Sequence, residues 1–485
     1  MGFMQKANPS FYKDKDQHLD KSLGVRDFLA LGIGTIISTS IFTLPGVVAA
    51  NYAGPAVVLS FLGAAIVAGL VAFAYAEMST VMPFAGSAYS WISVLFGEGF
   101  GWIAGWALLA EYFVAVAFVG SGFSGTFQAF LTSWHASLPK SLSLPSLVAD
   151  AHNHITLGGG VVDLIALLVI LLSAFIVWRG ASDAGKVSQV LVILKLAAVL
   201  IFIFVGLSAL HPANYTPFIA PHTAATVGGW KGITQGISVI FLAYIGFDSI
   251  AANSAEAKDP QKTMPRGILG SLAVAVVLFS AVTLVLVGMQ HYTNFATGDA
   301  LRSPIVWALG QAGYSTLSQV VSIIADAGMF IALLGMVLAG SRLLYSFGRD
   351  GMLPKAMGKL NSKGLPTNAL IVLTIVTVLI GAFLPFSFLA QLISAGTLVA
   401  FMFVSLGMFA LRRREGKDLP EPAYKMPLYP VLPALGFILS LYVFSNLGTD
   451  AKLYCGIWFV LGLIIYFAYG MHHGRAHQTV EADSE

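Results

Sequence analysis

The segment Gly32–Gly46 reads GIGTIISTSIFTLPG and lies within an apolar run long enough to cross a membrane. Its centre, however, carries three hydroxyl residues in a row, Ser38, Thr39 and Ser40. Ser and Thr compete for backbone hydrogen bonds and Gly weakens a helix, so we expect the helix to open here. Lipid offers no partners to the backbone groups that are freed, whereas a bound solute does. We therefore expect the rest of the chain to present a solute to this break.

The composition is that of a membrane protein. The chain has 485 residues, of which 57% are hydrophobic and 10% charged, whereas soluble domains carry about a quarter charged residues. We predict an all-α polytopic membrane protein with no cofactor, no bound metal and no nucleic-acid partner. Its single cysteine excludes an intramolecular disulfide and a cysteine metal cluster. Twelve apolar runs have spanning length: 28–50, 54–82, 100–130, 160–178, 187–210, 232–256, 267–290, 318–346, 368–384, 387–411, 428–447 and 453–470.

The lysines and arginines predict an orientation. If the chain crosses the membrane twelve times, four of its 26 lysines and arginines fall on the side opposite the termini: Lys140, Lys231, Arg302 and Lys452. The excess on the terminal side places both termini in the cytoplasm. The expected location is the plasma membrane, in a bacterial cell.

A second apolar run is interrupted in the same way. Residues 241–249 read FLAYIGFDS, with Gly246 and Asp248 at the centre. Two interrupted helices at matching places in two halves point to a transporter binding site. Glu111 and Asp326 are separated by about as many residues as the two interruptions are, so we predict two repeats of five helices. Because five is an odd number of crossings, the second repeat is inserted in the opposite orientation. The predicted parts are a cytoplasmic tail (1–27), the first repeat (28–210), the second repeat (231–411), two further helices (428–470) and a second cytoplasmic tail (471–485).

Four motifs carry a resemblance to a known family. They are GIGTII from Gly32 with Ile41-Phe42 and Pro45-Gly46, Tyr75-Ala76-Glu77, Tyr244–Asp248 with Asp259-Pro260, and Ser341-Arg342 through Arg349-Asp350-Gly351. Together they resemble the amino acid–polyamine–organocation (APC) superfamily of permeases, closest to the bacterial cationic amino acid transporter branch. The resemblance implies a LeuT-like fold with a five-plus-five inverted repeat and broken helices 1 and 6. It also implies uptake or exchange of amino acids or related amines.

An amino acid has a charge at each end of its backbone, and the two breaks offer a partner for each. A helix N-terminus favours a carboxylate, and freed carbonyl groups favour an ammonium. We assign the carboxylate to the amides of Ser38, Thr39, Ser40 and Ile41, and the ammonium to the carbonyls of Ile36, Ile37, Leu242, Ala243 and Ile245, with Tyr244 beside them. The alternative is that these hydroxyls serve helix–helix contacts. The family commonly has glycine at the places of Ser38 and Ser40, which leaves the identity of the amino acid open.

Three acidic residues lie inside predicted spans: Glu111, Asp248 and Asp326. The resemblance implies that Glu111 and Asp248 lie near the substrate side chain. Three acids meeting at one site would suit a cationic side chain. Alternatively, one of them is protonated, pairs with Lys195 or serves gating.

Lys195 lies deep in an apolar run with no acid nearby in the sequence. A charged residue at this depth indicates function by default, although a long side chain can also reach toward the interface. A desolvated amine releases its proton more readily than one in water. In proton-coupled members of the family, a similar lysine occupies the place of a sodium ion, so we predict that Lys195 is the proton carrier and contacts the broken first helix.

Further residues are candidates for gates. Phe247 abuts the second break, and Tyr244 and Trp106 are weaker candidates because buried aromatic residues usually serve packing. We expect Glu77, Arg342 and Arg349 to form ion pairs that close the cytoplasmic side.

These observations predict a secondary active transporter, proton-coupled, for L-amino acids by alternating access, with cationic substrates as one option. The alternatives are an amino acid/amine exchanger and, less in keeping with the short tail, a substrate-sensing receptor. An enzyme is not expected, because no nucleophile–base pair lies within the spans. An accessory subunit is left open.

Overall fold

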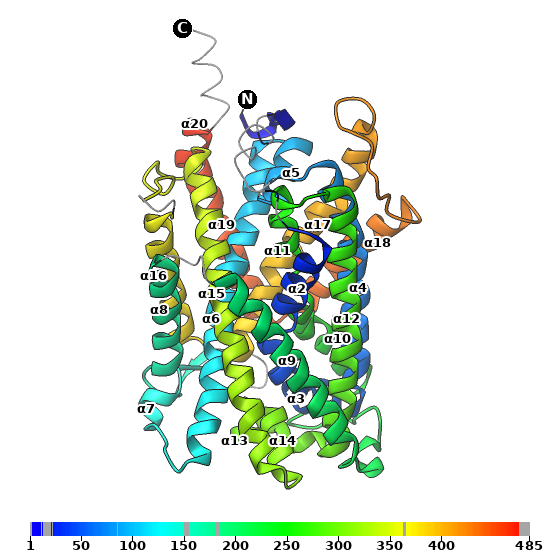
Figure 1. The fold of residues 1–485 in the computed structure, drawn as a ribbon, viewed down its shortest axis with the longest axis vertical. Helices are drawn as coiled ribbons and strands as arrows, with labels where there is room; N and C mark the ends of the chain where they lie inside the picture. The colour runs from blue at the N-terminus through cyan, green and yellow to red at the C-terminus, as the bar shows by residue number, and fades with distance from the viewer. Residues whose placement is uncertain are drawn as a thin grey trace.

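Helices follow the apolar runs of the sequence in a computed structural model of the protein (Figure 1). The structure describes residues 2–10, 12, 21, 23–84, 86–149, 155–179, 184–361 and 365–474. The predicted tails 1–27 and 471–485 therefore lie partly outside the described residues.

Seven stretches are long and apolar enough to cross a membrane, and four apolar helices are shorter. The long stretches contain α2 (Val25–Ile36), α3 (Thr39–Val48) and α4 (Val57–Val81), counted as one; α6 (Glu98–Ser133); α10 (Gly229–Ile240), η5 (Phe241–Tyr244) and α11 (Phe247–Ala252), also counted as one; α12 (Pro260–Met289); α15 (Ser315–Arg349); α17 (Phe386–Arg414); and α19 (Thr449–Ile465). The shorter helices are α8 (Leu164–Arg179), the later part of α9 (Ala184–Leu207), α16 (Thr367–Phe383) and α18 (Val431–Ser445). The structure therefore has the helices of a polytopic membrane protein, and the number of crossings stays a prediction.

Short elements cap the two ends of the bundle. They are η1 (Gly2–Met4), α5 (Ala88–Leu95), α7 (Lys140–Ser143), α13 (Gly298–Arg302), α14 (Pro304–Gln311) and α20 (Met471–His473). The strands β1 (Leu147–Ala149) and β2 (Ile155–Leu157) form an antiparallel pair that the all-α prediction did not include.

Both described ends of the chain lie at the same end of the bundle (Figure 1). The ring of Phe3 packs against Tyr466 at 5.6 Å and Phe467 at 6.3 Å between ring centroids. This aromatic contact attaches the N-terminal segment to the last long helix.

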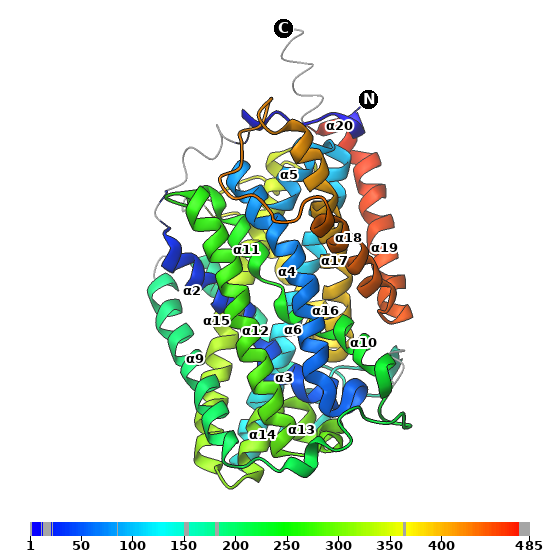
Figure 2. The same ribbon diagram turned by 90° about the vertical axis from the view of Figure 1, so that its right-hand side faces the viewer.

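Helix α6 is the centre of the packing. It lies against α5, α8, α15, α16 and α17, and most of its apolar stretch is buried. Helix α4 packs against α12 on another side of the molecule (Figure 2).

Glycine allows α2 and α12 to approach closely. A Cβ atom on Gly32 would lie 2.2 Å from Ser271 Oγ and 2.4 Å from Ile250 Cδ1. On the facing helix, a Cβ on Gly267 would lie 2.9 Å from Phe28 Cβ. No larger residue fits at position 32 without displacing its neighbours.

Candidate functional site

The first long helix is interrupted where the sequence predicts it. Helix α2 ends at Ile36 and α3 begins at Thr39. The Ser38 amide donates to the Ile36 carbonyl at 2.9 Å, a tight turn that no helix contains. Among the described residues, the amides of Thr39 and Ile41 have no backbone acceptor outside the helix, as expected for the first turn of a helix.

The hydroxyl groups at this break differ in their contacts. Ser40 Oγ lies 3.5 Å from the Ile36 carbonyl, at the limit of a hydrogen bond. Thr39 Oγ1 is buried and has no hydrogen-bond partner within the described residues, and its methyl group packs against Gly122 of α6. The break therefore holds buried polar groups whose hydrogen-bonding capacity is not used inside the chain.

The second interruption lies between η5 and α11, at Ile245 and Gly246. Gly246 has φ +127°, a conformation that glycine adopts readily and other residues rarely do. The Ile245 amide donates to the Leu242 carbonyl at 3.1 Å. One of the carbonyls predicted to face an ammonium therefore already accepts a hydrogen bond from the chain, although a carbonyl has two lone pairs.

The two breaks touch each other. Thr35 Oγ1 donates to the Gly246 carbonyl at 3.2 Å, and a Cβ on Gly246 would lie 3.1 Å from the Ile36 amide nitrogen. Residues more than 200 positions apart thus meet at a single place, where both helices release backbone groups. This juxtaposition is the central feature of the candidate site.

Lys195 reaches the same region from α9. Its ammonium nitrogen donates to the Gly34 carbonyl at 2.9 Å, and the residue is only 2% exposed. Its aliphatic chain packs on Gly328 of α15, since a Cβ there would lie 2.8 Å from Lys195 Cδ. Among the described residues Lys195 forms no ion pair, so the structure does not show the alternative of a structural bridge from Lys195 to one of the three acids.

Two of the three intramembrane acids come together. The carboxyl groups of Glu111 and Asp248 lie beside each other, each against the other's electrostatic field. Thr397 Oγ1 donates to Glu111 at 2.7 Å, and the Gly246 amide donates to Asp248 at 3.0 Å. The pair is therefore built into the wall of the second break.

Asp326 is not bonded to that pair. In the described part of the chain it forms no hydrogen bond or ion pair with Glu111 or Asp248, and its Oδ1 atom is buried without a partner. That all three acids meet at one site therefore stays a prediction for Asp326. No group of three histidine, cysteine or acidic side chains suited to a metal ion occurs within the described ranges.

Phe247 lies in a buried aromatic cluster beside the second break. Its ring is 5.3 Å from that of Tyr75 and 5.2 Å from that of Phe401. Tyr244 packs edge-on against Phe279 at 5.4 Å, and its buried hydroxyl has no partner among the described residues.

Trp106 packs against the last long helix. Its ring stacks on Trp458 at 4.6 Å, and each indole N–H donates to the other residue's carbonyl, at 2.8 and 2.9 Å. A side chain held by two reciprocal hydrogen bonds joins α6 to α19, and this argues against its predicted role as a mobile cover.

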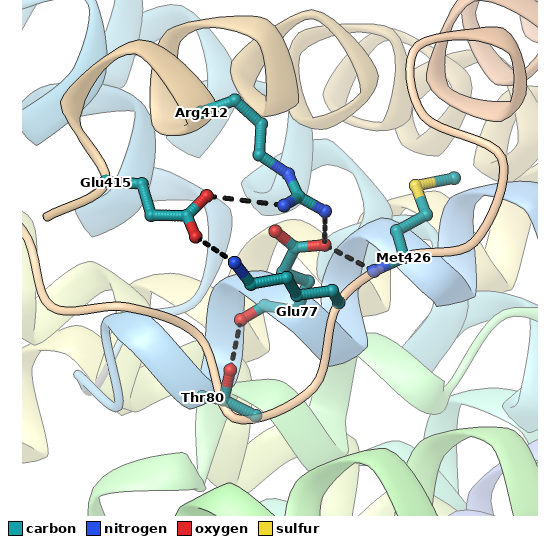
Figure 3. A network of polar contacts seen from close by, with 6 residues as sticks. Glu77, Thr80, Arg412, Glu415 and Met426 are labelled. Atoms are coloured by element: carbon teal, nitrogen blue, oxygen red, sulfur yellow. Dashed lines mark hydrogen bonds and ion pairs between the residues drawn. The ribbon is translucent and has the colours of Figure 1, made fainter.

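The ion pair of Glu77 is not with Arg342. Figure 3 shows Glu77 of α4 accepting from Arg412 of α17 at 3.0 Å and from the Met426 amide at 2.5 Å. Arg412 also contacts Glu415 at 3.3 Å, and Glu415 pairs with Lys425. The segment 415–427, which we call the strap, is thereby attached to α4. Sequence reasoning missed Arg412 because no local pattern links it to Glu77.

The other predicted gate residues lie elsewhere at this end. Arg342 is on an exposed face of α15. Arg349 pairs with Asp350 at 3.1 Å, and the Tyr89 hydroxyl donates to the same carboxylate at 3.0 Å.

Comparison with known proteins shows the family of this chain. Residues 23–469 match the family described as amino acid permease. The chain belongs to the amino acid permease family. It is 69% identical to the branched-chain amino acid permease BcaP of Lactococcus lactis subsp. cremoris (strain MG1363), over 97% of this chain and 99% of that protein.

More distant relatives carry other names. The methylthioribose transporter of Bacillus subtilis (strain 168) is 35% identical over 95% of this permease and 96% of the relative. The vacuolar cationic amino acid transporter 4 of Arabidopsis thaliana is 29% identical over 82% of this permease and 64% of the relative. The permease is therefore an APC superfamily member, a multi-pass cell-membrane protein that transports amino acids and is not an enzyme.

Proposed function

We propose that this permease is a secondary active transporter of branched-chain amino acids that works by alternating access. The observation that carries the proposal is the contact between the two broken helices at Thr35 and Gly246, because such a pair of breaks is typical of transporter binding sites. The 69%-identical relative named as a branched-chain amino acid permease supports the substrate class.

The backbone of the substrate binds between the breaks in this proposal. The amides of Thr39, Ser40 and Ile41 receive the carboxylate, favoured by the first-turn N–H groups and the dipole of the ten-residue helix α3, and the Ser38 amide joins them when it leaves the Ile36 carbonyl. The carbonyls of Ile37, Ala243 and Ile245 receive the ammonium, with Ile36 and Leu242 each contributing a second lone pair.

An apolar substrate side chain suits the surroundings of the breaks. Ile37, Ile41 and Phe247 are each 0% exposed. Glu111 accepts from Thr397 and Asp248 accepts from the Gly246 amide, so the two carboxyl groups offer less to a cationic side chain than two free carboxylates would. A cationic substrate is the second candidate, favoured by the presence of that acidic pair and by relatives named as cationic amino acid transporters.

Proton coupling through Lys195 is part of the proposal. When protonated, Lys195 holds the Gly34 carbonyl, two residues before the end of α2. Loss of the proton weakens this charge-assisted hydrogen bond and frees the first break. A ligand that binds one protonation state better than the other is thereby coupled to the proton.

The proposal includes a membrane topology. It has twelve crossings, with cytoplasmic tails at 1–27 and 471–485, two inverted repeats over 28–210 and 231–411, and two additional helices over 428–470. Phe247 serves as a gate in this scheme, and the Glu77–Arg412 pair closes the cytoplasmic side.

Uptake into proteoliposomes tests the proposal. We expect an inward proton gradient to drive uptake of labelled leucine, and isoleucine and valine to compete with it while lysine and arginine do not. Competition by lysine but not by isoleucine would favour the cationic candidate, and absence of any amino acid competition would overturn the substrate class.

A variant separates coupling from binding. Lys195→Met, which keeps the length of the stem, should abolish gradient-driven uptake while counterflow of leucine persists. The exposed Lys140→Met provides the control. Gradient-driven uptake by Lys195→Met at the wild-type rate, or uptake driven by sodium instead of protons, would refute the coupling. Counterflow without net uptake in the wild type would identify an exchanger.

A further inference from the structure

A groove with two cations lies between α12 and the strap. It has a volume of about 400 Å³ and is lined by Gln261, Lys262, Pro265, Arg266 and Leu269 on one side and by Ala423 and Tyr424 on the other. Figure 2 shows the strap at the end of the bundle where α12 begins. The volume is within the range of small-ligand sites.

The cations of the groove are available to a ligand. Lys262 and Arg266 are four residues apart, so they share a face of α12. Lys262 is 73% exposed, and its long ion pair at 3.7 Å with Asp259, which is itself 49% exposed, is open to competition by a ligand. Arg266 is exposed, and among the described residues no carboxylate pairs with it. The groove is therefore cationic and its lining contains no acidic side chain.

The same face of α12 continues as an apolar stripe. Val277 and Leu284 follow Arg266 by three and five helical turns, and they are 67% and 39% exposed. A few residues after Ala423 and Tyr424, the chain also presents exposed apolar residues, with Leu428 before α18 73% exposed and Val431 at its start 55% exposed. Arg266 thus marks the place where a lipid-facing surface meets the polar end of the bundle.

We propose that this groove binds the headgroup of an anionic phospholipid, with its phosphate on Lys262 and Arg266 and its acyl chains along Val277 and Leu284. Basic pockets at the membrane surface favour anionic headgroups over zwitterionic ones. The apolar stripe selects a lipid over a free phosphate ester, which has no acyl chain to bury.

Pro265 in α12 adds an acceptor to the site. Pro265 has no N–H group, so the helix lacks the usual donor for the Gln261 carbonyl. Gln261 lines the groove, and its carbonyl is available to a headgroup hydroxyl such as those of phosphatidylglycerol.

A bound lipid would also brace the strap. Ala423 and Tyr424 directly precede Lys425 and Met426, which bond to Glu415 and Glu77. The lipid therefore joins α12 to the segment that is attached to α4.

Lipid binding to the purified full-length protein in delipidated detergent micelles tests the proposal. Native mass spectrometry counts adducts of phosphatidylglycerol and of phosphatidylcholine with matched acyl chains. Lys262→Gln/Arg266→Gln should weaken phosphatidylglycerol binding roughly 30-fold, about fivefold per cation. Binding of phosphatidylcholine should be unchanged.

The control removes two equivalent charges from the same end of the protein. Lys355→Gln/Lys359→Gln, both exposed, should bind phosphatidylglycerol as the wild type does, and both double variants should retain the wild-type melting temperature without lipid. Equal phosphatidylglycerol binding by both double variants would overturn the site. Displacement of the lipid by millimolar glycerol 1-phosphate would identify a soluble-anion site and would overturn the lipid assignment.

Discussion

Replacing Arg412 by glutamine should destabilise the protein strongly, because it leaves the buried carboxylate of Glu77 without its positively charged partner. The Glu77 side chain is 0% exposed, and its Oε1 atom has no partner among the described residues. Its Oε2 atom accepts from Arg412 at 3.0 Å and from the Met426 amide at 2.5 Å. Without Arg412, one backbone N–H remains for a buried carboxylate. Breaking such a pair from one side costs about 3–5 kcal/mol.

The opposite replacement, Glu77→Gln, should cost less. The Arg412 side chain is 15% exposed and keeps its contact with Glu415 at 3.3 Å, so its charge stays compensated. We expect about 1–3 kcal/mol, the cost of lost hydrogen bonds to a charged group. Because the two residues interact directly, the double variant should lose at least about 2 kcal/mol less than the sum of the single losses.

The free energy of unfolding in mixed micelles, titrated with a denaturing detergent and followed by tryptophan fluorescence, measures these differences. Arg413→Gln is the matched control, because Arg413 is the exposed neighbour of Arg412, and it should change stability by no more than about 0.5 kcal/mol. A loss for Arg412→Gln as small as that for Arg413→Gln, or strict additivity of the two single variants, would refute the reasoning.

Three further predictions follow from the site and its surroundings. Gly246→Ala should destabilise the protein by about 1–3 kcal/mol and slow leucine uptake, since φ +127° disfavours a side chain and its Cβ would lie 3.1 Å from the Ile36 amide; Gly335→Ala on α15, with open space around it, should be neutral in both assays. Trp106→Phe should lower stability by about 1–2 kcal/mol through its lost hydrogen bond without changing the apparent affinity for leucine, and a large affinity change would restore Trp106 as a gate. The hydrogen bond from Lys425 holds the pKa of the Glu415 carboxyl below its usual value, so this link stabilises the strap above about pH 4.5 and is lost as the pH falls further. The protection of residues 419–427 against hydrogen exchange, relative to the intrinsic rate at each pH, should therefore fall on acidification in the wild type, and a Glu415→Gln variant that shows the same fall would contradict this role.

The helix interruptions could be predicted because their signal is local. Runs of Ser and Thr, or Gly beside Asp, weaken a helix wherever they occur, and both interruptions lie where these residues gather. The burial of Lys195 could also be predicted, because the length of an apolar helical run fixes how far the centre of that run lies from water.

The pairing of side chains across the bundle could not be predicted in the same way. Glu77 and Arg412 are separated by 335 positions, and the chain offers other arginines at the same end. Asp326 matches Glu111 in spacing, yet among the described residues no hydrogen bond or ion pair joins it to Glu111 or Asp248. Trp106 is of a residue type that often forms gates, and only the position of Trp458 shows that two hydrogen bonds fix it to α19. These outcomes depend on helix rotation and packing, which local periodicity does not fix.

The close approach of α2 and α12 has a mechanical consequence. With Gly32 against Ser271 and Gly267 against Phe28, the two helices interlock at the level of their backbones. They are therefore expected to travel as a single lever, carrying the end of α2 at the first break with them. A cross-link that fastens α2 to α12 should leave the permease working, whereas one that ties this lever to α6 should stall it.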